Sequence, residues 1–354
     1  MITKFKGKKI TGILSILPEN EYDYDEETKE IATIQTRRLK KVMGLGKRRA
    51  AKADSTTSDF CIYGLNYLLE KNLIRKEEIG AIIVVGLTPD YFIPHIGNII
   101  HGEFDLGKDV ICVDIPQGCA GFMMGLMQAY MMLDIIGDKK VVLFNGDVLC
   151  RKNPEDKIDE PTFGGDATTI TIVENDSTAP EIYMNMYMDG KEREALIMHA
   201  GGYKMPRSEE TSIPVDIGDG TYKSYDELWM DGSSVFNFVQ REVPPLIEEI
   251  LDYSGSTIEE IDWFLFHQPN KFMLQKLSDK IGIPYDKIPM NVVEKFGNSS
   301  GSTIPVNITY NLGEKLLNHT YKCCLSGFGA GLTWTSMVMN LGNLDFCEIM
   351  ESNY

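Results

Sequence analysis

The chain lacks any apolar run of about 18 uncharged residues, the length that a membrane-spanning helix requires. It also lacks low-complexity tracts, and its 43% of hydrophobic residues provide enough apolar surface for a folded core. Positive charge is scarce, because 35 Lys and Arg stand against 52 Asp and Glu, a formal net charge of −17. Such a field repels phosphate, so neither a membrane-embedded protein nor a general nucleic-acid binder is expected.

Patterns typical of metal sites and disulfide frameworks are absent as well. The seven cysteines form no Cys-x-x-Cys pair and the five histidines are scattered, so no metal site is expected. The first nine residues, MITKFKGKK, are basic, but no apolar run or cleavage site follows them as in a secretory signal. We therefore expect a cytoplasmic protein with reduced thiols.

Short runs rich in Val and Ile alternate with helical patterns along the chain. Such runs are typical of strands buried on both faces, and the alternation predicts a layered α/β fold. The predicted strands are 10–17, 79–85, 110–115, 140–144, 168–173, 261–266, 323–325 and 333–341, and the main predicted helices are 59–71, 121–136, 233–254 and 270–281. No Pro- or Gly-rich linker divides the chain, so we place only a soft boundary near residue 175, between halves 1–175 and 176–354.

One cysteine lies where a predicted strand turns into a predicted helix. Cys119 follows Gly118 in the segment ICVDIPQGCAGF, residues 111–122. The N–H groups at a helix start favour a thiolate, and the N–H of Cys119 points toward any oxyanion formed on a carbon bonded to the sulfur. A small buried hydrophobic residue, comparable with Cys112 or Cys324, is the alternative that this segment leaves open.

Three further segments carry polar groups at turns. His267 ends an apolar strand, where ligands bind in α/β proteins, although a lone histidine there is more often a core residue. Asn298 lies in a glycine-flanked turn, where an Asx-turn or a helix cap is the alternative. The glycines of 327–331 precede a strand-like segment rather than a helix, which excludes a dinucleotide loop but allows N–H groups to face a developing negative charge.

Together these segments resemble the β-ketoacyl-acyl carrier protein synthase III family of the thiolase superfamily. The resemblance covers essentially the whole chain and implies a duplicated, five-layered αβαβα fold, normally as a homodimer. It implies that the half 1–175 carries the nucleophilic cysteine and the half 176–354 the histidine and asparagine. The motifs that match, in the family's order and approximate spacing, are GCAGF (118–122), HQPN (267–270), GNSS (297–300) and GFGAGLTW (327–334).

The resemblance also implies a mechanism for fatty acid or specialised acyl and polyketide biosynthesis. Cys119 would take an acyl group from acyl-coenzyme A or an acyl carrier protein, with the N–H groups of Cys119 and Ala330 as the oxyanion hole. His267 and Asn298 would then bind the thioester carbonyl of a malonyl carrier protein and stabilise the enolate left by loss of carbon dioxide. No tightly bound cofactor is implied. A Cys-His-Asn set also fits plant-type polyketide synthases, whereas thiolases use a second cysteine and elongating synthases use two histidines.

The chain departs from the family in its first loop. The family's Trp, which grips the adenine of coenzyme A, is missing from TRRLKKVMGLGKR, residues 36–48, so the source of the acyl group stays open. Residues 37–52 hold eight basic residues and no acid, which fits either a solvated face or docking of a nucleotide phosphate or an acidic carrier protein. Ile93 falls near the family's acyl-gating position. The candidate coenzyme A or carrier-binding residues are Arg37, Arg38, Arg48, Arg49, Arg151, Lys271 and Lys276.

Two other functions use the same scaffold. A non-condensing acyltransferase would keep Cys119 but pass the acyl group to an alcohol or amine. A non-catalytic partner subunit of a polyketide-like complex typically loses the nucleophile, and the retained cysteine argues against it. Release of carbon dioxide from malonyl carrier protein distinguishes a condensing enzyme from the acyltransferase, whereas failure to acylate or alkylate Cys119 selectively over the other six thiols would favour the non-catalytic subunit.

Overall fold

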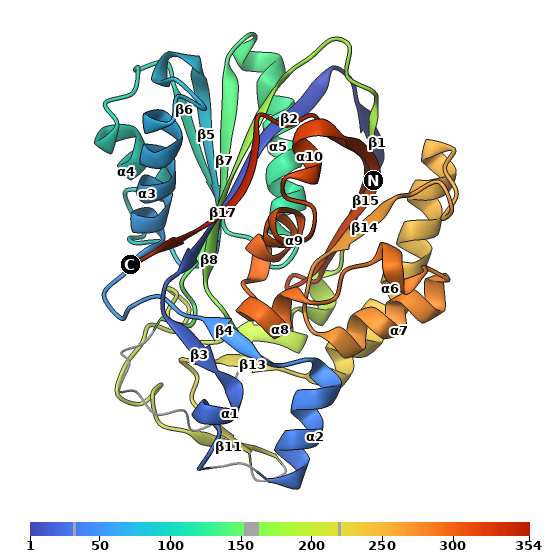
Figure 1. Cartoon of the computed structure of the whole chain (residues 1–354). Coiled ribbons are helices and arrows are strands. Elements are labelled where there is room, and N and C mark those ends of the chain that lie inside the picture. The colour runs from blue at the N-terminus through green and yellow to red at the C-terminus, as the bar shows by residue number, and fades with distance from the viewer. Residues whose placement is uncertain (31–32, 152–162, 219–220) are drawn as a thin grey trace.

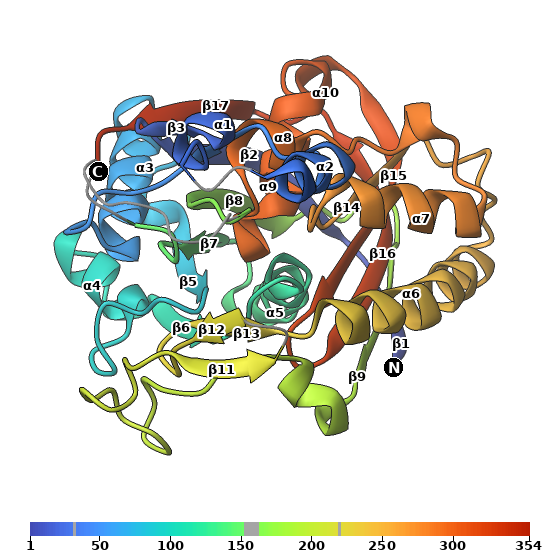
Figure 2. The same cartoon turned by 90° about the horizontal axis from the view of Figure 1, so that it is seen from below.

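Two β-sheets lie on either side of a central layer of helices, and further helices cover their outer faces (Figures 1 and 2). The structure is a computed structural model that describes residues 1–30, 33–151, 163–218 and 221–354. This order of layers is the αβαβα arrangement that the resemblance implied, so the predicted fold class is confirmed. In the described ranges no helix is long and apolar enough to cross a membrane.

The larger sheet has six strands and the smaller sheet five. In spatial order, the larger sheet contains β17 (Phe346–Ser352), β2 (Lys8–Pro18), β8 (Ala167–Asn175), β7 (Lys140–Asp147), β5 (Ile79–Val85) and β6 (Ile111–Ile115). The smaller sheet contains β1 (Ile2–Phe5), β9 (Ile182–Met188), β16 (Thr333–Gly342), β15 (Thr320–Gly329) and β14 (Trp263–Phe266). Because β5, β6 and β7 are parallel, as are β14 and β15, their carboxyl ends meet at shared sheet edges.

The helices form the other three layers. Between the sheets lie α5 (Gly121–Ile136) and α9 (Thr303–Asn311), with α10 (Lys315–Asn318) beyond them (Figure 2). The larger sheet is covered by α3 (Thr57–Glu70) and α4 (Ile96–Glu103), and the smaller sheet by α6 (Gly232–Ser254) and α7 (Lys271–Ile281). Each pair places its apolar face against the sheet that it covers.

Smaller elements lie near the edge of the larger sheet at which β2, β5 and β7 end (Figure 1). They are β3 (Glu21–Asp23), α1 (Tyr24–Glu27), α2 (Ile34–Met43), β4 (Lys47–Arg49), β10 (Leu196–Met198), β11 (Val215–Gly218), β12 (Thr221–Lys223), β13 (Leu228–Met230) and α8 (Val292–Phe296). Short 3-10 turns occur at Lys76–Glu78, Gly190–Ala195, Tyr285–Lys287 and Ser300–Ser302.

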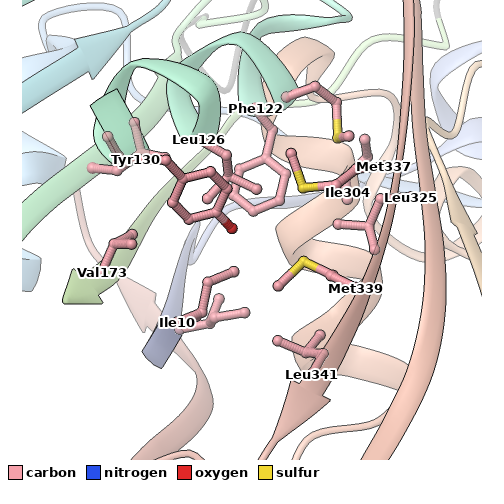
Figure 3. Packing of buried hydrophobic residues seen from close by; sticks show 14 of the residues in the cluster. Ile10, Phe122, Leu126, Tyr130, Val173, Ile304, Leu325, Met337, Met339 and Leu341 are labelled. Carbon is pink, nitrogen blue, oxygen red and sulfur yellow. The ribbon is translucent and has the colours of Figure 1, made fainter. Parts of the chain in front are cut away.

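A continuous hydrophobic core joins both sheets through α5. This helix is apolar on nearly every side, as GFMMGLMQAYMMLDII shows, because sheets flank it on two sides. Phe122 and Tyr130 of α5 are fully buried. Figure 3 shows this packing, with labels on Ile10, Phe122, Leu126, Tyr130, Val173, Ile304, Leu325, Met337, Met339 and Leu341.

The strands rich in Val and Ile were predicted correctly, whereas three other strands of the two main sheets and all the short strands outside them were missed. Predicted strand 140–144 continues to Asp147, and predicted strand 323–325 is the middle of β15. The missed strands of the main sheets are β1, β9 and β17. The soft boundary near 175 coincides with the end of β8, but each sheet takes an edge strand from the other half, β17 in the larger sheet and β1 in the smaller.

Candidate active site

Cys119 lies at the start of the central helix, against the glycine-rich turn between β15 and β16. Ala120 is the N-cap residue of α5, and a Cβ atom on Gly329 would come within 2.8 Å of the Cys119 sulfur. A Cβ atom on Gly327 would come within 3.0 Å of the Ala120 Cα. The glycines of 327–331 therefore allow two backbones to meet at the sulfur, and strand β16, not a helix, follows them.

Two backbone N–H groups face the sulfur of Cys119. Burial raises the pKa of the Cys119 thiol above its ordinary value, while hydrogen bonds from the N–H groups of Ala330 and Cys119 oppose this rise. The side chain of Gln117, which sequence reasoning did not single out, donates to the Ala330 carbonyl over 3.1 Å and holds this turn in place. An oxyanion on a carbon bonded to the sulfur would meet the same two donors.

His267 follows β14 directly and is buried. Its Nδ1 lies 2.6 Å from the hydroxyl oxygen of Thr303, at the start of α9, and its ring packs against Phe328. Burial lowers the pKa of His267 to about 3, so the imidazole is neutral at physiological pH. Cys119 and His267 are therefore a thiol and a neutral base in the resting protein, not a thiolate paired with an imidazolium.

Asn298 follows α8 and Gly297 in a turn beside Phe163. Its N–H donates to the Phe163 carbonyl over 2.7 Å, and its Oδ1 accepts the N–H of Ser300 over 3.0 Å. The Asx-turn named as the alternative for Asn298 is thus present. Since Oδ1 is engaged, the group that Asn298 can offer to a substrate carbonyl is the Nδ2 amino group, a donor.

Two buried aspartates anchor the loops around this site. Asp147, at the end of β7, accepts the N–H groups of Leu87 and Thr88 over 2.6 Å and 3.1 Å. Asp166 accepts the N–H groups of Ala51 and Cys150 over 2.9 Å and 2.8 Å. Burial raises the pKa of Asp147 to about 7 and that of Asp166 to about 6.

The predicted binding residues are dispersed. Arg48 is buried, and its guanidinium forms two hydrogen bonds with Glu27, of 2.7 Å and 2.8 Å. Arg49 donates to the Pro18 carbonyl and pairs with Glu351 at 2.8 Å. Both arginines hold β4 to its neighbours, and their role in binding coenzyme A or the carrier stays a prediction.

The other basic candidates are nearer the surface. Arg37 and Arg38 are exposed on α2, and Arg151 donates to the Ser55 carbonyl over 3.1 Å. The aliphatic part of Lys271 lies where α7 meets Gly44 at the end of α2, while Lys276 is exposed farther along α7. The helices α2 and α7 thus bring four of the basic candidates to neighbouring surfaces (Figure 1).

Ile93 lies on an outward-facing loop. It is 81% exposed, and its neighbours Tyr91 and Phe92 are also exposed. The ring of Phe92 contacts Tyr203, which comes from the segment between β10 and β11. Within one chain, Ile93 therefore faces solvent.

The neutral state of His267 predicts the pH dependence of Cys119 alkylation. The rate of reaction with iodoacetamide is expected to rise smoothly from about pH 5 to about pH 9, without an inflection near the ordinary histidine pKa of about 6.5. Intact mass and peptide mapping measure labelling of Cys119 at each pH. A plateau with an inflection near pH 6.5 or below, lost in His267→Ala, would show an ion pair instead.

Comparison with known proteins places the chain in a family. Residues 251–341 match the family model of the 3-oxoacyl-[acyl-carrier-protein] synthase III C-terminal region. The putative 3-oxoacyl-[acyl-carrier-protein] synthase 3 of Campylobacter jejuni is 30% identical over 348 residues, which cover 97% of each chain. The β-ketoacyl-[acyl-carrier-protein] synthase III of Streptococcus uberis is 30% identical over 302 residues, 84% of this chain and 88% of that protein.

A solved structure supports the same family assignment. The crystal structure of 3-oxoacyl-(acyl-carrier protein) synthase from Burkholderia xenovorans matches with a TM-score of 0.89 and 30% identity, and the match covers 99% of each chain. The resemblance carried by the four motifs is thereby confirmed. This chain belongs to the β-ketoacyl-acyl carrier protein synthase III family, the acyltransferases that act as condensing enzymes within the thiolase superfamily.

Proposed function

We propose that this protein carries an acyl starter on Cys119 and joins it to a malonyl thioester by decarboxylative Claisen condensation. The observation that carries the proposal is the position of the Cys119 sulfur, at the start of α5 and facing the N–H groups of Cys119 and Ala330. The acyl donor is acyl-coenzyme A or an acyl carrier protein, and no resident cofactor takes part.

The acyl group enters by thioester exchange. Neutral His267 takes the thiol proton as the Cys119 sulfur bonds to the acyl carbon, and the oxyanion lies against the two N–H groups. The oxyanion then collapses, the carbon–sulfur bond to the donor breaks, and the departing thiolate takes the proton back from His267. The acyl group is left on Cys119, and the imidazole is again neutral.

The condensation forms a carbon–carbon bond. A malonyl thioester loses carbon dioxide, and the electron pair of the broken bond becomes an enolate whose oxygen accepts from the Asn298 Nδ2 and from His267. This step uses the tautomer of neutral His267 that carries its proton on the nitrogen facing the substrate, whereas acylation uses the other tautomer. The enolate carbon attacks the acyl carbon on Cys119, and the resulting oxyanion uses the same two N–H groups. Its collapse breaks the carbon–sulfur bond to Cys119, releases the β-ketoacyl thioester and leaves a Cys119 thiolate that takes a proton from water.

Acylation and condensation can be tested separately. Intact mass after incubation with acyl-coenzyme A and acyl carrier protein panels is expected to increase by one acyl group, and not in Cys119→Ala. Asn298→Asp keeps the oxygen that accepts the Ser300 N–H but removes the Nδ2 donor. It is expected to acylate normally while releasing carbon dioxide from malonyl carrier protein about 10²–10³-fold more slowly.

Two outcomes would contradict this proposal. An acyl mass that persists in Cys119→Ala would show a different nucleophile. Acylation without any release of carbon dioxide from malonyl carrier protein would show a non-condensing acyltransferase.

We propose that an acyl carrier protein docks on the surface shared by α2 and α7. The names of the related synthases include this carrier. Helix α7 begins at Lys271, four residues after His267, so its start is close to the site. Arg37, Arg38 and Lys276 are exposed there on a chain of net charge −17, which matches a local basic surface to an acidic partner.

Charge reversal tests this docking surface. Arg38→Glu combined with Lys276→Glu is expected to raise the KM for malonyl carrier protein about three- to tenfold at low salt, since exposed charge pairs contribute modestly. Arg75→Glu is the matched control, because Arg75 is exposed but precedes the amino end of β5. An unchanged KM in the double variant, or an equal rise in Arg75→Glu, would exclude this surface.

We also propose that two copies pair along β6 as a homodimer. β6 is one edge of the larger sheet among the described residues, and Ile111 on it is 37% exposed. Unprotected apolar edges favour strand pairing. The outward loop with Phe92 and Ile93 would then reach the acyl pocket of the second copy, which gives Ile93 the gating role expected from the resemblance.

The two edges of the same sheet supply a matched test of the dimer. Ile349 lies on the opposite edge strand, β17, and is also 37% exposed. Ile111→Lys is expected to shift the mass in solution from dimer to monomer, whereas Ile349→Lys leaves it unchanged, as measured by light scattering after size exclusion. A monomeric parent protein, or a dimer in Ile111→Lys, would contradict pairing along β6.

A further inference from the structure

Ser300 stands at the centre of the candidate site in an unusual backbone conformation. It opens the short turn Ser300–Ser302, just before α9, and its side chain is buried. Its φ of +52° lies in the left-handed region, which residues with a Cβ atom rarely adopt. Such a conformation persists only when the surrounding contacts determine it.

The backbone of Ser300 contacts both His267 and Asn298. Its N–H donates to the Oδ1 of Asn298 over 3.0 Å. Its carbonyl accepts from the Thr303 hydroxyl over 3.0 Å and lies within hydrogen-bonding reach of the His267 imidazole. The left-handed turn is therefore what allows one residue to orient both side chains.

The hydroxyl of Ser300 lies close to the backbone next to Cys119, the third residue of the Cys-His-Asn set. A Cβ atom on Gly118, the residue before Cys119, would come within 3.2 Å of the Ser300 Oγ, and one on Gly301 within 3.0 Å of the Gly118 carbonyl. The turn thus lies directly against the backbone that carries the thiol. With its Oγ beside the residue that precedes Cys119, the Ser300 side chain acts against the rise in the pKa of the Cys119 thiol.

We propose that the Ser300 hydroxyl donates a hydrogen bond to the Cys119 sulfur and makes Ser300 a fourth catalytic residue of this site. The inference rests on the proposed role of Cys119 as nucleophile. A hydroxyl donates more strongly to a thiolate than to a neutral thioester, so the bond strengthens as negative charge builds on the sulfur. That charge appears when the thiol loses its proton for attack and again when the sulfur leaves the acyl carbon.

Two substitutions separate the hydroxyl from the backbone conformation. Ser300→Ala removes the hydroxyl but keeps a Cβ atom at the left-handed φ, whereas Ser300→Gly removes the hydroxyl and suits this φ. Ser299→Ala is the matched control, because Ser299 is the buried neighbour of the same type. The readout is the pH profile of Cys119 alkylation by iodoacetamide, followed by peptide mass.

Both Ser300 variants are expected to move the midpoint of the profile to higher pH. The rate at neutral pH should fall about three- to tenfold, since a hydrogen bond to a charged group is lost and the more basic thiolate is partly compensated by higher nucleophilicity. Ser299→Ala should follow the parent protein. The acylation rate from an acyl thioester should fall in the same two variants.

Three results would overturn the inference. Parent-like profiles in both Ser300 variants would show that the hydroxyl does not act on the sulfur, while leaving Cys119 as the labelled nucleophile. A slow Ser300→Ala beside a parent-like Ser300→Gly would assign the effect to the backbone. Failure of Cys119 to react in preference to the other six cysteines of the parent protein would instead overturn the nucleophile assignment itself, and this inference with it.

Discussion

The position of α5 between the two sheets is the constraint on which the candidate site depends. Both faces of this helix pack into one core, which includes Phe122 and Tyr130. The start of the helix must therefore lie where the carboxyl end of β6 delivers the chain, so the place of Cys119 is set by packing. The neighbouring hairpin of β15 and β16 can approach the sulfur only because Gly327 and Gly329 carry no side chain.

Burial also determines the charge state of the site. It raises the pKa of the Cys119 thiol and lowers that of His267 to about 3, so both groups are neutral at rest. The hydrogen-bond donors therefore stabilise the negative charge that the reaction creates, and no such charge is present in the resting enzyme. They thus stabilise the transition state more than the resting enzyme. The burial of the two groups and the hydrogen-bond donors around them thus act together.

The sequence predicts the buried strands well, because strands covered on both faces are continuous runs of Val and Ile. Strand β17, FCEIMES, was not predicted because it is an edge strand with exposed glutamates. Strand β9, IYMNMYM, was not predicted because it contains few β-branched residues. Cys119, His267 and Asn298 were identified through motifs. Their order along the chain gives no distances, and these come only from the three-dimensional packing.

Other features of the site could not be read from local sequence. The basic run 37–52 does not reveal that Arg48 and Arg49 pair with Glu27 and Glu351, the latter about 300 residues away. Ser300 lies in a polar run of serines, where neither its left-handed φ nor its approach to Gly118 leaves a compositional sign. The ion pairs and the conformation of Ser300 both arise from tertiary packing.

The exchange of edge strands has a consequence for how the chain acquires its structure. The larger sheet is formed mostly by residues before Asn175, yet its edge strand β17 is the segment Phe346–Ser352; the smaller sheet, in turn, takes β1 from Ile2–Phe5. During synthesis, β2 therefore lacks its partner β17 on one side until the segment up to Ser352 has left the ribosome. The duplicated fold has two similar halves, but these halves cannot complete their folding one after the other.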